Sequence, residues 1–442
     1  MDNYKLSRYN YFVDYKNRKL FFNGLKGNGF CMTMDEYNHL QRMLSDLKEF
    51  EKQFPDDFER LKGLGYIVEE SFDEVAYIRF MNKQQVFADR HYHLIINPTL
   101  SCNFKCWYCY EENKGGKMSN ATILRIKKHI KNKVEKEHIP SLHIGWFGGE
   151  PLLGFQNVVY PISMYAKRLC KRNNIPFSSS ITTNGFLINK DMVEKIKRTG
   201  LSSFQITLDG DKEKHNSVRN NNGEPSYERI IENIRLICTE IKHSHINLRI
   251  NYDEKTFTRE DIFSLLEEFP QEIRQKININ TQRVWQTSDK KEDKEKNLLP
   301  KFISSAHEKG YRLTCQGSLN IGSFYTCYAS RMNYANINYD GKVYKCTARN
   351  YTDKNFLGEL DTNGNIIWQM DKIAKMYSSS SIENKECLEC EYLPLCCGQC
   401  IQNFMEHGSG CRYRNNRQNF FNEEIKRYYT NLRLNHSKQK VK

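Results

Sequence analysis

The sequence predicts an α/β protein: a partial (β/α)6 barrel of the TIM type, with a small α+β module before it and a cysteine-rich domain after it. Three observations predict this class. Short apolar runs alternate with amphipathic helical stretches from about residue 93 onward. Strands and short helices in a different order precede them. Most of the 15 cysteines fall either at the start of the alternating region or after its end.

Six strands are expected in the barrel, each an apolar run bounded by turn-forming or polar residues. Strands that alternate with helices over this length favour parallel pairing through crossover helices. Six units are fewer than the eight of a closed barrel, so the barrel is expected to be open. The expected strands are residues 93–98, 142–147, 178–183, 204–208, 246–251 and 277–281, and the expected helices are 119–137 with Ser119 as its cap, 155–172, 226–242 and 258–268.

The first ninety residues predict a separate α+β module. Strands are expected at residues 9–14 and 20–23, and helices at 34–50 and 58–64. The charged run 288–296 is expected to be a solvated loop. The resulting domains are 1–88 for the module, 89–310 for the barrel, 311–420 for the cysteine-rich domain, and 421–442 for a C-terminal helix with a basic tail.

Composition restricts the compartment and the partners. The chain has 442 residues and a formal net charge of +14. No long apolar run opens it, so neither a signal peptide nor a membrane span is expected. The protein is therefore expected in the cytoplasm, where thiols stay reduced, and this favours metal ligation over disulfides. A basic surface attracts acidic partners, either nucleic acid or an acidic peptide.

Three cysteines follow the first expected strand. Cys102, Cys106 and Cys109 have C-x3-C-x2-C spacing, which arises at random with a probability of only about 0.02 in a chain of this cysteine content. Three thiols can hold three corners of an iron–sulfur cube and leave the fourth iron open to bind a substrate and pass it an electron. A structural zinc site is the alternative, although zinc prefers four ligands.

Unusual segments follow the next three expected strands as well. They are Gly148-Gly149-Glu150 after the second, Asn184-Gly185 after the third and Asp209-Gly210 after the fourth. Because the chemistry of such barrels lies at the C-terminal ends of the strands, these segments and the triplet predict one shared site.

A second group of cysteines follows the barrel, and eight of them are spaced to fill two four-thiolate sites of iron–sulfur or zinc type. A hairpin is expected at 338–344, with Asp340-Gly341 at its turn. Cys170 and Cys238 lie on apolar helix faces and are expected in the core, whereas Cys397 is ambiguous. The eight cysteines are Cys315, Cys327, Cys346, Cys387, Cys390, Cys396, Cys400 and Cys411.

These motifs together resemble a known enzyme family. The triplet with Tyr108 fits the C-x3-C-x-aromatic-C motif, Gly148-Gly149-Glu150-Pro151 fits the GGEP motif, and the spacing from Cys327 to Cys411 fits a seven-cysteine signature. Residues 93–411 therefore resemble a radical S-adenosylmethionine (SAM) enzyme with a C-terminal SPASM domain.

The resemblance implies SAM and three [4Fe-4S] clusters as cofactors. The triplet would hold the SAM-binding cluster, and an external donor such as flavodoxin or ferredoxin would supply electrons. Relatives vary at the position of Cys315. The first auxiliary cluster would use Cys315, Cys327, Cys346 and Cys400, and the second would use Cys387, Cys390, Cys396 and Cys411.

The resemblance also implies contacts to SAM, and no catalytic residue is assigned beyond the cluster ligands. The two glycines would let the backbone approach SAM, Glu150 would bind its ammonium, and Arg219 would bind its carboxylate. The alternatives are surface charges for Glu150 and Arg219, a strand residue for Thr207 and a turn former for Asn184. The implied contacts are Tyr108 on the adenine, Gly148, Gly149, Glu150, Asn184, Thr207 and Arg219.

The substrate is expected to be a peptide. Sulfatase-maturing relatives carry an Asp where this chain has Thr347, which argues against that activity. The N-terminal module resembles recognition domains that bind a leader peptide as an added strand, although it could instead cap the barrel and bind nothing.

The expected function is hydrogen abstraction from a precursor peptide, which gives a thioether, a carbon–carbon crosslink or an epimer. The alternatives are a sulfatase-maturing enzyme and a non-catalytic electron-transfer or nucleic-acid-binding protein; neither nucleic acid nor a membrane is an expected partner.

Overall fold

The computed structural model of this chain divides into two compact units. The terminal unit comprises Met1–Ala88, Gly317–Met332 and Asp371–Lys442, and the barrel unit comprises Asp89–Gln316 and Asn333–Met370. Each unit is described by itself. The residues described are 3–88, 91–112, 115–284, 286, 298–314, 319, 321–322, 324, 327–378, 382–398, 400–408, 411 and 413–439.

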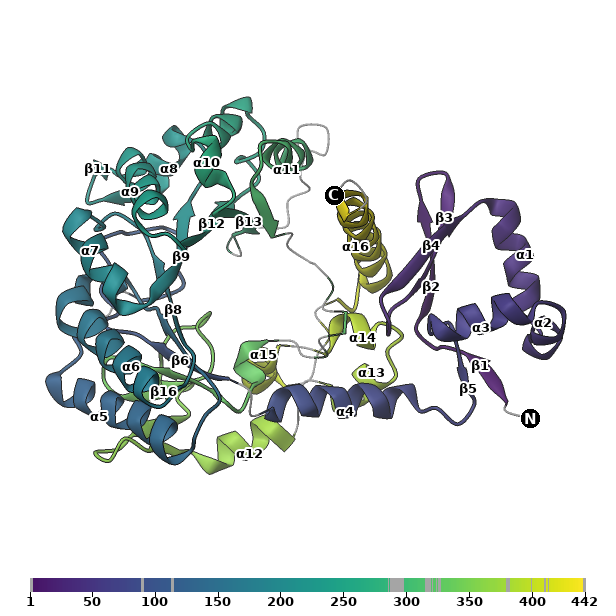
Figure 1. The fold of residues 1–442 in the computed structure, drawn as a ribbon, viewed down its shortest axis with the longest axis horizontal. Coiled ribbons are helices and arrows are strands. Elements are labelled where there is room, and N and C mark those ends of the chain that lie inside the picture. The colour runs from purple at the N-terminus through teal and green to yellow at the C-terminus, as the bar shows by residue number, and fades with distance from the viewer. Residues whose placement is uncertain are drawn as a thin grey trace. The chain divides into compact units, whose positions relative to one another are not determined.

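The barrel unit is built on one curved sheet, with strand order β14-β13-β12-β9-β8-β7-β6-β15-β16-β17-β18 in its described part (Figure 1). All six predicted strands are present, and each pairs in parallel with the next. The predicted open (β/α)6 barrel is therefore confirmed. The six strands are β6 (Tyr92–Ile96), β7 (Leu142–Trp146), β8 (Phe177–Thr183), β9 (Leu201–Leu208), β12 (His245–Tyr252) and β13 (Ile277–Arg283).

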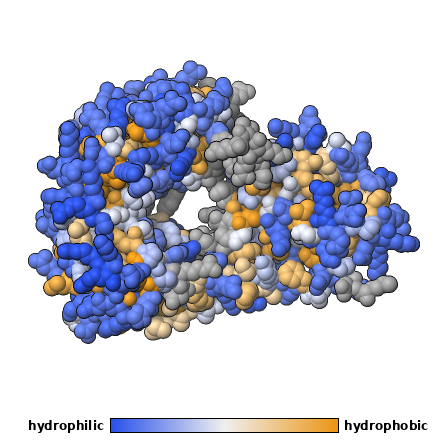
Figure 2. Space-filling model, in the orientation of Figure 1, coloured by the Kyte–Doolittle hydropathy of each residue, from blue (hydrophilic) through white to orange (hydrophobic). Residues whose placement is uncertain are grey.

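Helices cover the outer side of this sheet (Figure 1), and the surface over them is largely hydrophilic (Figure 2). Ser119 caps α5 as predicted, because its side chain accepts the Thr122 N–H. The segment predicted as one helix at 155–172 begins as a π-helical turn and continues as α6. Pro161 lacks the N–H that would donate to Asn157 in one continuous α-helix. The helices are α5 (Asn120–Lys131), α6 (Tyr160–Arg172), α7 (Lys190–Thr199), α8 (Lys212–Val218), α9 (Tyr227–Glu240), α10 (Gln271–Arg274) and α11 (Leu299–Glu308).

Shorter elements complete this unit. The segment predicted as a helix at 258–268 is a 3-10 helix, η4 (Glu260–Leu266). Cys170 and Cys238 are buried in the core, as predicted. The remaining elements are η1 (Asn132–Lys136), η2 (Pro151–Gly154), η3 (Phe155–Val159), β10 (Asn220–Asn221), β11 (Glu224–Pro225) and β14 (Arg312–Thr314).

The segment after residue 333 extends the barrel sheet beyond β6. Strand β15 (Tyr334–Ile337) pairs with β6 in parallel, and β16 (Lys342–Tyr344), β17 (Gly358–Leu360) and β18 (Ile366–Trp368) follow in antiparallel order. The predicted hairpin is present, and Gly341 at its turn has a φ of 90°. The chain order alone had not indicated that this segment joins the barrel.

The N-terminal part of the terminal unit is an α+β module, as predicted. The helix expected at 34–50 is divided in two, because the Asp46 side chain accepts the Lys48 and Glu49 N–H groups and starts a new helix. A sheet of order β2-β3-β4 lies beside a two-stranded sheet of β1 and β5. The elements are β1 (Tyr4–Leu6), β2 (Asn10–Tyr15), β3 (Arg18–Asn23), β4 (Asn28–Met32), β5 (Ile67–Glu69), α1 (Met34–Leu44), α2 (Leu47–Gln53), α3 (Pro55–Gly63) and α4 (Glu74–Phe87).

The C-terminal segment packs on this module and shares its core. Tyr11 on β2 stacks on Tyr392 with ring centroids 5.4 Å apart, and its hydroxyl donates to the Glu391 carbonyl at 2.5 Å. Helix α16 also contacts β2. The C-terminal elements are η6 (Tyr328–Ser330), α12 (Met370–Ser378), α13 (Lys385–Leu388), α14 (Leu393–Cys396), α15 (Ile401–His407) and α16 (Arg417–Gln439). No helix in the described part of the chain is both long and apolar enough to span a membrane.

Candidate functional site

The predicted triplet and six of the seven predicted SAM contacts line one cavity of about 330 Å³. The segments that line it follow β6, β7, β8 and β9. Because these parallel strands end at the same edge of the sheet, segments far apart in the sequence meet there. We call this space the triplet cavity. The predicted residues that line it are Cys102, Cys106, Cys109, Tyr108, Gly148, Gly149, Asn184, Thr207 and Arg219.

The triplet forms a tight loop after β6. The Cys109 N–H donates to the Cys106 carbonyl at 3.1 Å, and the Phe104 N–H donates to the Cys102 Sγ at 3.4 Å. Burial raises the pKa of the Cys102 thiol to about 12 and that of Cys106 above its usual value. A bound metal would offset this cost, since thiolates are the ligating form.

The spacing of the side chains argues against a single small ion. Among the described residues, no three His, Cys, Asp or Glu side chains are gathered closely enough to hold one metal ion. An iron–sulfur cube spreads its thiolate ligands over separate iron atoms, so it does not need such a tight group. The three thiols lining one open cavity fit this larger group.

Gly148 and Gly149 are required by contacts with backbone. A Cβ on Gly149 would lie 2.3 Å from the Ser101 carbonyl oxygen and 2.6 Å from that of Leu100. A Cβ on Gly148, which has a φ of 100°, would lie 2.4 Å from the Thr99 oxygen. The glycine pair therefore packs directly against the chain that leads into Cys102.

Glu150 is the predicted SAM contact that does not line the triplet cavity in the described part of the chain. Its side chain is fully buried. Its carboxylate accepts the Leu152 N–H at 3.0 Å, the Thr183 hydroxyl at 2.7 Å and the Asn184 N–H at 2.7 Å. Burial raises its pKa, and these donors oppose the rise. Glu150 thus fixes the end of β8, and its contact with SAM stays a prediction.

Asn184 reaches toward the triplet from the end of β8. Its amide nitrogen donates to Asn103 Oδ1 at 2.8 Å and lies 4.0 Å from the Cys102 Sγ. Its backbone is held by Glu150. Through these contacts, the segments after β6, β7 and β8 are joined by hydrogen bonds.

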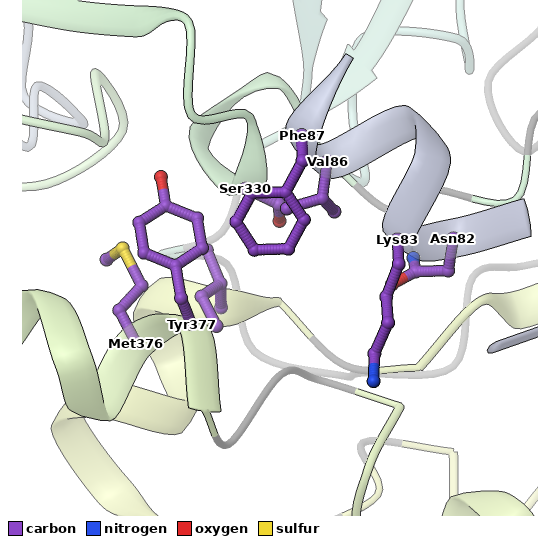
Figure 3. Close-up of a pocket in the computed structure, with 8 residues that line it drawn as sticks. Asn82, Lys83, Val86, Phe87, Ser330, Met376 and Tyr377 are labelled. Carbon is purple, nitrogen blue, oxygen red and sulfur yellow. The ribbon is translucent and has the colours of Figure 1, made fainter. Parts of the chain in front are cut away.

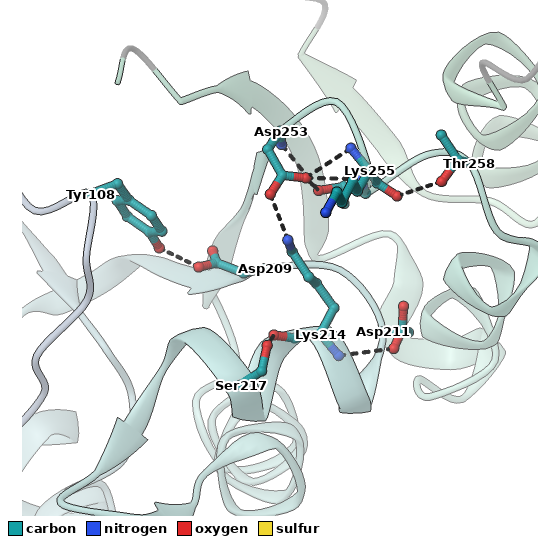
Figure 4. Close-up of polar contacts among 9 residues, drawn as sticks. Tyr108, Asp209, Asp211, Lys214, Ser217, Asp253, Lys255 and Thr258 are labelled. Atoms are coloured by element: carbon teal, nitrogen blue, oxygen red, sulfur yellow. Dashed lines mark hydrogen bonds and ion pairs between the residues drawn. The ribbon is translucent and has the colours of Figure 1, made fainter. Parts of the chain in front are cut away.

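Tyr108 lies at the centre of a polar network that the sequence did not predict. Its hydroxyl donates to Asp209 (Figure 4) and accepts from Arg219 Nη1 at 2.8 Å and Asn251 Nδ2 at 3.2 Å. Burial raises the pKa of the Asp209 carboxyl, and the Arg219 charge opposes the rise. The sequence placed Asp209 at the shared site because it follows the fourth predicted strand. It gave no role to Asn251, whose position at the end of the fifth predicted strand was the signal that could have identified it.

An ion pair lies at the same edge of the sheet. Lys214 on α8 forms an ion pair with Asp253 at 2.5 Å (Figure 4). Asp253 also accepts the Thr256 hydroxyl at 2.8 Å. These contacts fix the segment after β12 beside α8.

Glu111 is another residue that sequence reasoning missed. It lines the triplet cavity, and burial raises its pKa to about 7. Its buried Oε2 has no hydrogen-bond partner in the part of the chain that the structure describes. A carboxyl near neutral pKa beside a reaction space can hold or release a proton, but nothing in its spacing distinguishes it from a surface acid.

The predicted ligands of the first auxiliary cluster are divided between the units. Cys346 lies in the barrel unit, where Tyr110 donates to the Thr347 carbonyl at 2.8 Å and the Glu112 N–H donates to Asn350 Oδ1 at 2.9 Å. These bonds tie the Cys346 segment to the chain that leaves the triplet. Cys327 and Cys400 belong to the terminal unit, and Cys315 lies outside the described residues.

The predicted ligands of the second auxiliary cluster all belong to the terminal unit. Cys387, Cys390 and Cys396 pack against its core. Burial raises the pKa of Cys387 and Cys390, and the charge of a nearby Cys411 thiolate raises it further. The Arg417 charge lowers the pKa of Cys390. Cys397 is buried and has a φ of 53°, beyond the end of α14.

One further cavity in the terminal unit is too small to be a ligand site. It measures about 20 Å³ and is lined by Asn82, Lys83 and Phe87 of α4 with Met376 and Tyr377 of α12 (Figure 3). That volume is close to the space that one water molecule needs.

Residues 96–266 match the protein-family model described as the radical SAM superfamily. The matched stretch contains the triplet, the glycine pair and the ends of β7, β8 and β9. Residues 96–266 form a radical SAM domain. Its triplet cavity contains the three cysteines predicted to hold the SAM-binding cluster.

Curated relatives share parts of the radical SAM domain. An uncharacterized protein from Methanocaldococcus jannaschii is 35% identical over 119 residues, which is 27% of this chain and 38% of that protein. A probable GTP 3',8-cyclase from Saccharolobus islandicus is 28% identical over 190 residues, 42% of this chain and 54% of that protein. The chain therefore spans about two fifths to half the length of these relatives.

Solved structures resemble a larger part of the chain. A structure of anSMEcpe with bound AdoMet has a TM-score of 0.56 at 18% identity, covering 79% of this chain and all of that one. SuiB of Streptococcus suis bound to S-adenosylmethionine has a TM-score of 0.50 at 16% identity, covering 92% of this chain and 97% of that one. At these identities, the likeness shows that the fold is shared.

Proposed function

We propose that this protein is a SAM-dependent radical enzyme that modifies a peptide. The observation that carries the proposal is the triplet cavity, which gathers three thiols and six predicted SAM contacts inside a radical SAM domain. When bound, a [4Fe-4S] cluster and SAM supply an electron and a 5'-deoxyadenosyl radical that removes hydrogen from the substrate.

The chain's own residues would bind and orient these groups. The three cysteines would hold the cluster, and Arg219, fixed by Tyr108, would bind the SAM carboxylate. Gly149 leaves the backbone open beside the triplet. The auxiliary cysteines would hold two further clusters as an electron path, with a ferredoxin or flavodoxin as the external donor. The cytoplasm, where thiols remain reduced, suits all three clusters.

A groove in the N-terminal module supports a peptide substrate. A cavity of about 460 Å³ is lined by β4, α1 and α3. Strand β4 is at the edge of the three-stranded sheet, so its outer backbone groups are available to pair with an added strand. We call this the β4 groove and propose that it binds the leader of a precursor peptide.

Related folds have been solved with peptides. One structure is described as anSMEcpe with bound AdoMet and Kp18Cys peptide, at a TM-score of 0.57, and another as SuiB bound to precursor peptide SuiA, at 0.50. These descriptions support a peptide for this chain as well. Thr347 stands where sulfatase-maturing relatives carry an Asp, so we favour a ribosomally made precursor over a sulfatase.

Charge in the β4 groove refines the expected leader. The groove is lined by Glu36, Asp57 and Arg60, together with apolar side chains that include Leu40 and Leu61. The basic net charge of the whole chain is therefore not concentrated there. We assign leader affinity to main-chain hydrogen bonds and apolar contacts rather than to attraction of an acidic leader.

The first test is cleavage of SAM. Protein reconstituted anaerobically with iron and sulfide, then reduced with dithionite, is expected to release 5'-deoxyadenosine from SAM. The triple variant Cys102→Ala, Cys106→Ala and Cys109→Ala should lose this activity by at least about a thousandfold, since without its ligands the cluster is lost. The matched control is Cys170→Ala with Cys238→Ala, two buried cysteines outside the cavity. Equal activity of the triple variant and the wild type would refute the proposal.

The second test identifies the modification. A short open reading frame beside the gene is co-expressed with the enzyme, and the peptide is analysed by tandem mass spectrometry. A crosslink through sulfur or carbon lowers the mass by two hydrogens, whereas epimerisation leaves the mass unchanged and requires chiral analysis. If the peptide is identical to the one made in cells without the enzyme, the proposal that this peptide is the substrate is wrong.

A further inference from the structure

A second cavity in the barrel unit adjoins the triplet cavity. It measures about 170 Å³ and shares eight lining residues with the triplet cavity, including Cys109, Gly149 and Thr207. Its other walls include residues at the ends of β12 and β13. Whole small-molecule ligands usually occupy about 300 to 1,000 Å³, so this space fits a single amino-acid side chain. We call it the side-chain cavity.

The lining of the side-chain cavity has an excess of positive charge. It contains three arginines, Arg219, Arg249 and Arg283, and one acidic residue, Glu111. Even with Glu111 ionised, two more cations than anions face this space. Burial lowers the pKa of the Arg249 guanidinium, Tyr110, Tyr108 and Asp209 partly oppose this fall, and the nearby Arg219 charge adds to it. A bound anion would offset both costs.

Arg249 is held in a fixed orientation. Its Nε donates to Asn251 Oδ1 at 2.7 Å, and Asn251 Nδ2 in turn donates to the Tyr108 hydroxyl at 3.2 Å. Residues 249 and 251 lie two apart on β12, so they share a face of the strand. No carboxylate in the described part of the chain forms an ion pair with Arg249. Its terminal nitrogens are therefore available for a bidentate contact.

We propose that Arg249 binds a carboxylate side chain of the substrate peptide, an Asp or Glu at or next to the residue that loses hydrogen. The proposal rests on the peptide-modifying function proposed above and specifies the substrate class of that site. Arg219 is the predicted partner of the SAM carboxylate, which leaves Arg249 to receive an anion from the substrate. A carboxylate there would lie beside the cavity whose cysteines would hold the cluster.

The test uses reconstituted protein loaded with SAM and four blocked peptides. The peptides are N-acetylated and C-amidated Gly-Gly-X-Gly-Gly, with Asp, Asn, Glu or Gln at X, so that only the side chain carries a carboxylate. Dissociation constants are measured by anaerobic equilibrium dialysis. We expect the better acidic peptide to bind at least about tenfold more tightly than its amide partner, the ratio that about 1.4 kcal/mol gives.

Two variants assign the effect to one residue. Arg249→Gln should reduce the acid-to-amide preference to about twofold or less. The matched control is Arg259→Gln, an exposed arginine paired with Glu213 and Asp261 outside both cavities, which should keep the preference. Circular dichroism and iron content establish that each variant folds and holds its clusters.

Three outcomes would overturn the proposal. Equal or undetectable binding of acidic and amide peptides to the wild type is one, and a preference that survives in Arg249→Gln is the second. The third is a SAM dissociation constant that rises tenfold in Arg249→Gln while the peptide preference remains, because Arg249 would then belong to SAM. Failure of the proposed function is distinguishable, since it is the absence of 5'-deoxyadenosine from the wild-type reaction.

Discussion

Gly149 illustrates how a motif residue can be required by packing. The sequence predicted that the glycine pair lets backbone approach a ligand, and Gly149 does line the triplet cavity. Its missing side chain also leaves room for the carbonyls of Leu100 and Ser101. The same glycine therefore shapes both the cavity and the loop that carries Cys102.

Gly149→Ala is expected to destabilise the fold by about 1 to 3 kcal/mol, the usual cost of forcing extra atoms into a packed site. The clash is with backbone, so no side-chain rotation relieves it. Urea unfolding of the variant measures the loss, and iron content after reconstitution measures damage to the triplet. Gly63→Ala is the control, since a Cβ there would meet nothing within 4 Å. Equal losses in both variants would contradict this explanation.

The sequence predicted which polar residues lie at the site, but not which residues they form hydrogen bonds with. Arg219 and Tyr108 were both predicted to contact SAM, and the structure shows that they also contact each other. Glu150 was predicted as a SAM contact, and it accepts three hydrogen bonds from the chain. Sequence spacing cannot distinguish these cases, because the bonds of Glu150 to Thr183 and Asn184 and of Tyr108 to Arg219 span 33 to 111 residues and depend on which strands are neighbours.

At the scale of elements, α5 joins the strands of the barrel to the strands added after residue 333. Arg125 donates to the Leu360 carbonyl at 2.7 Å, and His129 Nδ1 donates to the Gly364 carbonyl at 2.8 Å. His129 Nε2 then accepts the Tyr92 hydroxyl at 2.6 Å. The buried imidazole is neutral, and it connects α5, β6 and the turn before β18.

His129 makes stability depend on pH in a defined window. Burial lowers the pKa of His129 to about 4 in the folded protein, whereas an unfolded histidine titrates near 6.5. The unfolded state therefore binds more protons between these values, and stability is lost as pH falls through them. The loss between pH 7 and pH 5 is about 2 kcal/mol.

His129→Gln tests this dependence, because Gln does not titrate and can both donate and accept. The variant should lose less stability than the wild type between pH 7 and pH 5, by about 2 kcal/mol. Denaturant unfolding at both pH values measures the difference. Parallel pH profiles for the two proteins would contradict the assignment to His129.

At the scale of the whole molecule, the terminal unit is discontinuous in sequence. The module at its N-terminus shares a core with residues from the C-terminal segment, including Tyr392, Leu395 and Phe421. Deletion of the module would expose this core, so a point substitution is a cleaner test of leader binding than truncation.

Met43→Glu is expected to weaken binding of the co-expressed precursor peptide at least tenfold, about 1.4 kcal/mol. Met43 lines the β4 groove, and a carboxylate there would place charge against an apolar ligand. Met34→Glu is the matched control on the same helix, because Met34 is exposed and absent from the described lining of the groove. Fluorescence anisotropy with labelled leader measures affinity. Equal binding by both variants would remove the groove from the leader-binding proposal.

The sequence by itself determined the class of the domain, the six barrel strands and the identity of the triplet. Hydrophobic alternation and cysteine spacing are local signals, and they are present in a single stretch of chain. Only the tertiary structure decided that Asn251, Arg249 and Glu111 accompany the triplet. It also decided that residues 333–370 extend the barrel sheet while their flanking cysteines belong to the other unit. The physical reason is that strand pairing and shared cores bring together residues hundreds of positions apart, and no local pattern records those contacts.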